Sequence, residues 1–304
     1  MKPFNIFKSL IGMCMLTLLL SSQTWANENL RCSGNSNCAG TVSKDTDAPK
    51  DMVLVPSGSF LMGIDKVVNV DTKKMSKRQQ LRYAVSREAF HDEGPAHNVI
   101  LDAFHIDKYE TSNKKYSEFM KATDHPAPAY WDDSKRNKPN QPVSGVNYHD
   151  AKAYCSWANK RLPTEAEWEK TARGPEGYKY PWGNEDPNKT KLNFNQEVKK
   201  TTIIGSYGAG KSDYQVYDLA GNVSEWVYDW HLPEFYLFSP KKNPLGPKNG
   251  HYKVIRGGNW RSNADDVKMV YRNATIPTIR KNTLGFRCAQ SKSKSSSKYP
   301  NPSE

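Results

Sequence analysis

Residues 161–169, RLPTEAEWE, carry the clearest structural signal in the chain. Thr164 and Glu167 stand three positions apart directly after Pro163, which is the spacing of a capping box. The threonine hydroxyl and the glutamate carboxylate each satisfy a backbone N–H that the start of a helix leaves free. Gly174 follows, and glycine commonly ends helices. The stretch therefore predicts a helix between Thr164 and Gly174.

A second helix is expected just upstream, over residues 148–159. Ala151, Tyr154, Cys155 and Ala158 recur at helical spacing, so one face of this helix is apolar. Cys155 lies on that face, where it suits a structural bridge.

Farther out, the periodic signals become shorter. Residues 113–121 predict a short helix, and residues 52–63 hold two apolar runs around a Pro-Ser-Gly turn, which predicts a hairpin. After Gly174, aromatic residues, Gly and Asn dominate, as is typical of short strands and ordered loops. This combination favours an α+β fold.

The N-terminus has the pattern of a secretory signal. Two lysines precede an apolar run over residues 10–20, which is too short to span a bilayer stably. Small residues at Thr24 and Ala26 predict cleavage after Ala26, and hence a periplasmic or secreted protein with no stable membrane span. An uncleaved membrane anchor is the alternative.

The remaining segments follow from composition. Residues 27–50 are polar and predict a linker, and residues 291–304 predict a disordered tail. Residues 65–93 are charged and predict a surface insertion, either a lid or an ornament. One folded domain is therefore expected over residues 51–290.

Charge excludes one class of partner. Removing residues 1–26 deletes two lysines and no acid, so the formal charge falls from +12 to +10. The basic residues are mostly scattered, which predicts a solvated surface and no nucleic-acid partner.

Four cysteines remain after the signal, and an even number in an exported chain predicts two disulfides. Cys32 and Cys38 are close enough to pair locally. Cys155 with Cys288 would close a long loop, worth about 5 kcal/mol at most.

Nine short motifs between residues 52 and 289 together match one family. They are Val55-Pro56-x-Gly58-x-Phe60-x-Met62-Gly63, Glu93-Gly94-Pro95-x-His97, Tyr109-Glu110-Thr111-x-Asn113, Pro142-Val143-Ser144-Gly145-Val146, Arg161 to Glu169, Tyr180-Pro181-Trp182-Gly183, Gly221-Asn222-Val223-Ser224-Glu225-Trp226, Arg256-Gly257-Gly258-Asn259-Trp260 and Gly285-Phe286-Arg287-Cys288. The chain resembles the sulfatase-modifying factor family, which includes the formylglycine-generating enzymes. The resemblance implies a single mixed domain with a C-type-lectin-like core, and it also pairs Cys155 with Cys288.

The resemblance further implies a structural calcium ion. Its ligands would be the side chains of Asp218 and Glu225 and the carbonyls of Gly221 and Val223. Two carboxylates around a glycine turn suit calcium, which takes six to eight oxygens in a flexible cage. The alternative is a polar turn whose carboxylates bond backbone N–H groups. A second family calcium site is matched only at Asn193 and the Phe194 carbonyl.

The chemistry of the formylglycine-generating enzymes is expected to be missing. They hold copper between two thiolates, and soft thiolates are what Cu(I) selects. The family positions of these cysteines fall on Ser262 and Val267, which do not bind Cu(I). His91, Asp92, Glu93 and His97 have spacing that permits a transition metal, although a solvated surface is the simpler interpretation.

The residues left at this place are of types that dominate binding surfaces. They are Trp260, Arg261, Ser262, Asn263, Tyr271 and Arg272. A core position for Trp260 and Tyr271 is the alternative. Asp265 and Asp266 beside Arg261 would be acid–base groups or a salt-bridged rim.

We therefore expect a calcium-stabilised binding or maturation factor for a polypeptide or small ligand in the periplasm. The alternative is an oxidoreductase of the same family, performing a formylglycine-like oxidation or siderophore maturation.

Overall fold

The computed structural model describes residues 49–65, 77 and 90–292, all within the unit formed by residues 45–304. The predicted signal peptide, nearly all of the linker, the Cys32–Cys38 pair, most of the charged insertion and most of the tail lie outside the described residues. Within the described part, no helix combines the length and apolarity that a membrane crossing needs.

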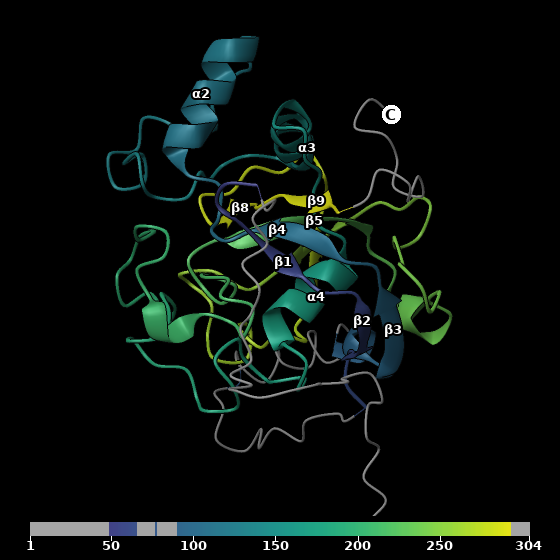
Figure 1. Ribbon diagram of the computed structural model, residues 1–304. Helices are drawn as coiled ribbons and strands as arrows, with labels where there is room; N and C mark the ends of the chain where they lie inside the picture. The colour runs from purple at the N-terminus through teal and green to yellow at the C-terminus, as the bar shows by residue number, and fades with distance from the viewer. Residues whose placement is uncertain (1–48, 66–76, 78–89, 293–304) are drawn as a thin grey trace, which may run out of the picture. The chain divides into compact units, whose positions relative to one another are not determined.

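The described residues form short strands, three α-helices and three 3-10 helices connected by long ordered loops (Figure 1). The strands are β1 (Met52–Val55), β2 (Gly58–Met62), β3 (His97–Leu101), β4 (Phe104–Asp107), β5 (Ser224–Trp230), β6 (Lys253–Arg256), β7 (Asn273–Thr275), β8 (Leu284–Gly285) and β9 (Ala289–Ser291). The helices are η2 (Phe90–Glu93), α2 (Asn113–Thr123), α3 (Tyr148–Trp157), α4 (Glu165–Arg173), η3 (Gly208–Gly210) and η4 (Pro233–Leu237). This confirms the α+β class.

Three small sheets divide the strands, in the orders β1-β4-β9, β2-β3 and β7-β6-β5-β8. All neighbours are antiparallel except β5 and β8. The predicted hairpin over residues 52–63 is wrong, because β1 pairs with β4 while β2 pairs with β3. The two apolar runs are adjacent in sequence but enter different sheets.

The predicted helices are confirmed as α2, α3 and α4. Both α3 and α4 begin with capping boxes, and Thr164 and Glu167 form the box of α4 as expected. All nine residues of α4 are buried, and the helix contacts β2, β3, β5 and β6. In Figure 1 it lies at the centre of the ribbon, so it is the element around which the sheets are arranged.

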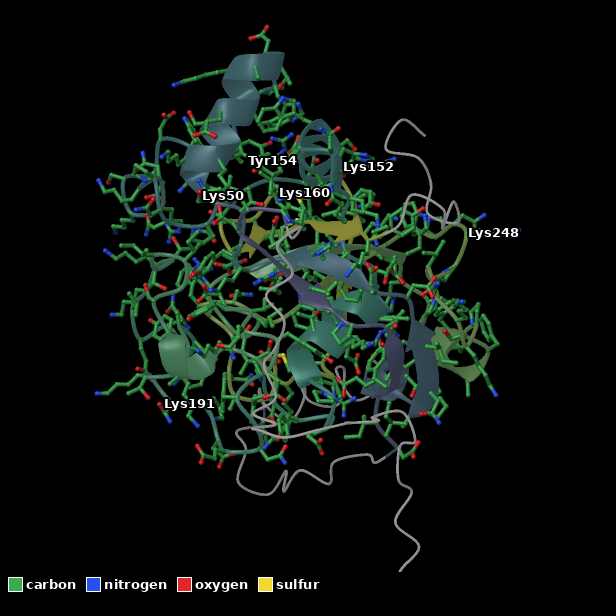
Figure 2. All side chains as sticks on the ribbon, in the orientation of Figure 1. Lys50, Lys152, Tyr154, Lys160, Lys191 and Lys248 are labelled. Carbon is green, nitrogen blue, oxygen red and sulfur yellow. A yellow bond between two sulfur atoms is a disulfide. The ribbon has the colours of Figure 1, made fainter. Side chains whose placement is uncertain are left out.

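Two apolar clusters make up the core, one around Trp168 of α4 and the other around Trp226 of β5. The predicted disulfide between Cys155 and Cys288 is present and joins α3 to the residue before β9. The lysines labelled in Figure 2 arise from separate elements, among them Lys152 of α3 and Lys248 of a distant loop, as the scattered charge predicted.

Candidate functional site

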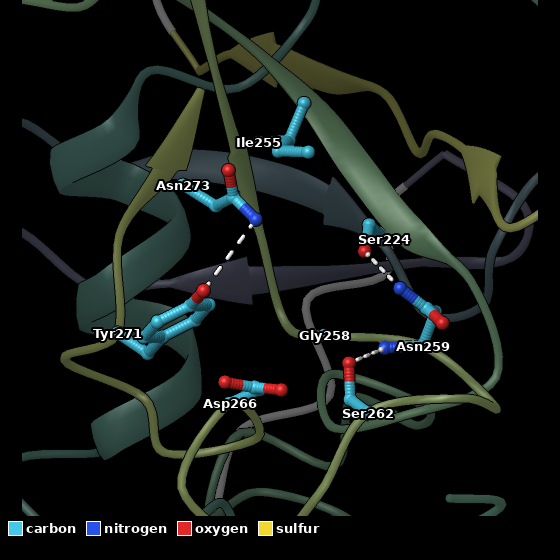
Figure 3. A pocket seen from close by; sticks show the side chains of 8 residues that line it. All are labelled: Ser224, Ile255, Gly258, Asn259, Ser262, Asp266, Tyr271 and Asn273. Carbon is cyan, nitrogen blue, oxygen red and sulfur yellow. Dashed lines mark hydrogen bonds between the residues drawn. The ribbon is translucent and has the colours of Figure 1, made fainter. Parts of the chain in front are cut away.

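A small polar pocket lies where β5, β6 and β7 meet the loop over residues 257–272 (Figure 3). Its lining is Ser224, Ile255, Gly258, Asn259, Ser262, Asp266, Tyr271 and Asn273. The cavity volume is about 50 Å³. Pockets for drug-sized ligands begin near about 300 Å³, so this space takes only a small chemical group, such as a short side chain or a few water molecules.

Two glycines allow the loop to pack against β6. Gly257 and Gly258 have φ angles of 87° and 66°, which side chains rarely adopt. A Cβ on Gly258 would also stand 2.6 Å from the carbonyl oxygen of Asp266. The pair of glycines therefore brings the segment carrying Asp266 against the strand and closes one wall of the pocket.

Asn259 organises the opposite wall. Its backbone N–H donates to Ser262 Oγ at 3.1 Å, and its side-chain amide donates to Ser224 Oγ at 3.0 Å. The side-chain carbonyl oxygen of Asn259 accepts a hydrogen bond from the backbone N–H of Arg261 at 3.0 Å. Both serine hydroxyls are therefore held by one residue and keep their own protons for other acceptors.

Tyr271 supplies a neutral phenol. Burial, with the nearby Asp266 charge adding to it, raises the pKa of Tyr271 well above its ordinary value. Its hydroxyl accepts a hydrogen bond from Asn273 Nδ2 at 3.5 Å. Figure 3 shows the phenol and the Asp266 carboxylate on the same side of the pocket. The pocket thus offers hydroxyl, amide and carboxylate groups.

The two family cysteine positions are separated by burial. Ser262 lines the pocket, whereas Val267 is fully buried in the cluster around Trp168. Position 267 thus contributes a packed aliphatic side chain and no group that faces the pocket.

The structure divides the predicted binding surface. Ser262 and Tyr271 line the pocket, while Arg261 and Asn263 are exposed beside it. Trp260 is only 3% exposed, and its indole N–H donates to the Asn282 carbonyl at 3.4 Å. Trp260 is therefore a core residue, and the exposed Arg261 side chain stacks on its ring.

The prediction that Arg272 belongs to the binding surface is wrong, because its side chain is buried. Its Nε and Nη2 donate to the two carboxylate oxygens of Glu165 at 2.8 and 2.9 Å. The neighbouring Arg256 donates to Glu169 at 2.5 Å. These pairs attach the end of β6 and the following loop to α4, whose buried carboxylates require cations.

The predicted calcium turn contains its two carboxylates, both buried. Asp218 accepts from the backbone N–H of Gly205 at 2.6 Å. Glu225 accepts from Arg287 at 2.6 and 2.7 Å and from the Trp168 indole at 2.9 Å. Each carboxylate oxygen has two lone-pair sites, so these bonds leave acceptor capacity for a cation.

A third buried carboxylate, Glu110, lies at the same turn and was not predicted. It accepts from Asn222 Nδ2 at 2.6 Å and from the backbone N–H of Val223 at 3.1 Å. Its motif was visible in the sequence, but the contact spans more than a hundred residues. Burial holds the pKa of Glu110 well above its ordinary value and raises the pKa of Asp218 to about 6.

A divalent cation would balance this turn in its fully ionised form. Three carboxylates face Arg287, so full ionisation would leave two negative charges in excess, which a buried site rarely tolerates. Calcium would be held by the side chains of Asp218 and Glu225 and by the carbonyls of Gly221 and Val223. Among the described residues, no three His, Cys, Asp or Glu side chains converge as metal ligands, so such a site depends on these carbonyls.

The other candidate groups have separate partners. Asp92 bonds His231 Nε2 at 2.6 Å, and His97 Nδ1 lies 3.0 Å from the Pro95 carbonyl. Asp265 pairs with Lys268 at 2.5 Å, as a salt-bridged rim predicts. The position of the His91 side chain lies outside what the structure describes.

The sequence profile of the "Sulfatase-modifying factor enzyme 1-like domain" matches residues 39–292. The chain belongs to this family. A formylglycine-generating enzyme of Thermomonospora curvata is 32% identical over 302 residues, which cover 79% of this chain and 93% of the relative. The fold and family expectations are therefore confirmed, including the C-type-lectin-like core.

Two further relatives define the extent of the match. The serine/threonine-protein kinase pkn1 of Chlamydia caviae is 33% identical over 260 residues. The match covers 79% of this chain but only 38% of that protein. The structure of PvdO from Pseudomonas aeruginosa superposes with a TM-score of 0.64 at 25% identity, covering 80% of this chain and 96% of the other. The shared part is thus one domain that occurs alone or within longer proteins.

Proposed function

We propose that this family member is an exported binding or maturation factor that acts without copper–thiolate chemistry on a polypeptide or small ligand. The observation that supports this most is at the two family cysteine positions. Ser262 brings a hydroxyl to the pocket, and Val267 is buried in the core. The two described cysteines are joined to each other and supply no thiolate.

The pocket itself supports binding. Its hydroxyl and amide groups are fixed by Asn259, so they are preorganised for hydrogen bonds to a ligand. Tyr271 and Asp266 add a phenol and a carboxylate to the polar lining.

The test of this proposal is a direct assay for formylglycine formation. The purified protein is incubated with a sulfatase-type cysteine peptide, copper and reductant, and the peptide mass is measured. We expect the peptide to remain unmodified. Conversion of its cysteine to formylglycine would overturn the proposal, and a formylglycine-generating enzyme serves as the positive control.

We also propose that calcium stabilises the turn over residues 218–225. Calcium at a hundred times its dissociation constant would add about 2.7 kcal/mol to the free energy of unfolding. The melting temperature should therefore fall in excess chelator and recover with added calcium. Asp218→Asn, which keeps the side-chain shape, should reduce this response, and identical melting curves with and without chelator would contradict the site.

An oxidoreductase remains the second candidate, because relatives in this family carry enzyme names that imply chemistry at the same domain. Elemental mass spectrometry on protein purified without chelator separates the two functions. Calcium without copper or iron is the result expected of a binding factor. Near-stoichiometric copper or iron would favour the oxidoreductase.

A further inference from the structure

The Arg261 guanidinium stacks on the ring of Trp260, and we call this pair the cationic platform. Its guanidinium lies 4.4 Å from the centroid of the Trp260 ring, a cation–π distance. The position of the ring is fixed, because Trp260 is buried and its indole N–H donates to the Asn282 carbonyl oxygen. A guanidinium stacked on a fixed ring loses less freedom on binding than a free one.

The guanidinium of Arg261 lies at the surface of the described residues. The residue is exposed, and within the part of the chain that the structure describes no carboxylate lies within ion-pair distance of it. Two acids of the adjoining loops already have partners, since Asp265 pairs with Lys268 and Asp133 pairs with Arg136.

A second arginine contacts the same ring. The Arg136 guanidinium lies 5.2 Å from the centroid of the Trp260 ring, and its side chain is 9% exposed. Because Arg136 is paired with Asp133, the charge at this ring that has no ion-pair partner among the described residues is that of Arg261.

This cationic platform adjoins the pocket. The backbone of Arg261 is held by Asn259, and the next residue, Ser262, lines the pocket wall. Neighbouring Cα atoms are about 3.8 Å apart, so the pocket and the platform are within the reach of one short peptide. The pocket has room for a short side chain only, while the platform stands outside it.

We propose that Arg261 is a carboxylate-binding subsite of this pocket and that the ligand is an acidic polypeptide segment. One side chain of the segment enters the pocket, and a neighbouring carboxylate binds the planar guanidinium through two parallel N–H···O bonds. The inference rests on the proposed function, because it requires the pocket to bind a ligand. A polypeptide is favoured over a small molecule because the pocket and the Arg261 guanidinium are adjacent but separate, and two neighbouring groups of one segment can occupy them.

The experiment measures peptide binding as a function of charge. Fluorescent ten-residue peptides, matched in length and apolar content and running from formal charge −4 to +4, are titrated against the mature chain by anisotropy at low salt. We expect acidic peptides to bind up to about fivefold more tightly than neutral ones, since an exposed ion pair contributes up to about 1 kcal/mol. Arg261→Gln should remove this preference, and Arg261→Lys should retain only part of it.

Two controls separate this inference from its premise. Lys121→Gln removes one charge from the exposed end of α2 and should keep the preference for acidic peptides. Ser262→Trp fills the pocket and should abolish binding of all peptides, with circular dichroism confirming the fold.

The outcomes are distinct. An unchanged charge preference in Arg261→Gln would overturn the role of Arg261 while leaving the pocket as a binding site. Full binding by Ser262→Trp would instead overturn the pocket. A series in which no peptide binds would overturn the polypeptide ligand and leave only a small molecule for the proposed function.

Discussion

Arg261 and Arg272 have the same local sequence, an aromatic residue followed by arginine, and opposite environments. Arg261 is exposed on top of Trp260, whereas Arg272 is 4% exposed and bonded to Glu165. Nothing within the loop distinguishes them, because the partner of Arg272 lies 107 residues away on α4. The sequence identified both as candidate surface residues and was wrong for the second.

The pair of Arg272 and Glu165 predicts a large and specific loss of stability. Arg272→Met removes the cation that is hydrogen-bonded to both Glu165 oxygens and leaves only Arg256, whose Nε lies 3.7 Å from Glu165 Oε1, which should lower the free energy of unfolding by about 3 kcal/mol. Denaturant unfolding measures this. Arg261→Met, the same change at an exposed position, should have little effect, and equal losses in both variants would contradict the assignment of the buried pair.

At the scale of elements, local signals were sufficient for helices and insufficient for strands. The capping box of α4 spans only four residues, from Thr164 to Glu167, so the start of this helix could be predicted from the local sequence. The partners of β1 and β2 are β4 and β3. Their paired residues are 49 to 55 positions apart (Val55–Phe104 to Met52–Asp107) and 35 to 43 positions apart (Met62–His97 to Gly58–Leu101), and no short-range pattern indicates this choice. Asp229 adds a cap that the sequence did not reveal, since its carboxylate accepts from the Glu165 backbone N–H at 2.7 Å.

Asp229 predicts a pH dependence at the start of α4. Burial, with the adjacent Glu165 carboxylate adding to it, raises the pKa of Asp229 from 3.8 to about 8, while Lys253 and Arg272 act in the other direction. The folded state therefore holds this proton more tightly than the unfolded state. The resulting stability is fully present below about pH 4 and is lost as the pH rises through 8.

Asp229→Asn keeps an oxygen for the Glu165 N–H and removes the titration. Between about pH 5 and 8, the wild type should lose stability relative to this variant by up to about 1.4 kcal/mol per pH unit. Urea unfolding at several pH values measures the difference. Asp132→Asn, at an exposed position, is the matched control, and parallel profiles for Asp229→Asn and wild type would contradict the buried acid.

At the scale of the molecule, long-range contacts complete what the motifs only indicated. Glu110 reaches the turn at Val223, and Arg136 reaches the ring of Trp260, both across more than a hundred residues. The motif order was sufficient to recognise the family and the position of the pocket. The three buried carboxylates at the turn over residues 218–225 and the contact of Arg136 with the Trp260 ring arise only from folding, because their members come from separate segments.

The disulfide joins such distant segments covalently. Cys155 and Cys288 are 133 residues apart, and in the chain-entropy description the bond restricts the unfolded chain by about 5 kcal/mol at most. The double variant Cys155→Ala/Cys288→Ala should therefore unfold at markedly lower denaturant concentration than the oxidised wild type. Wild-type protein unfolded in reductant should approach the variant, because both then lack the bond. If the oxidised wild type and the variant unfolded together, the bridge would contribute nothing and the fold would depend on its two apolar clusters alone.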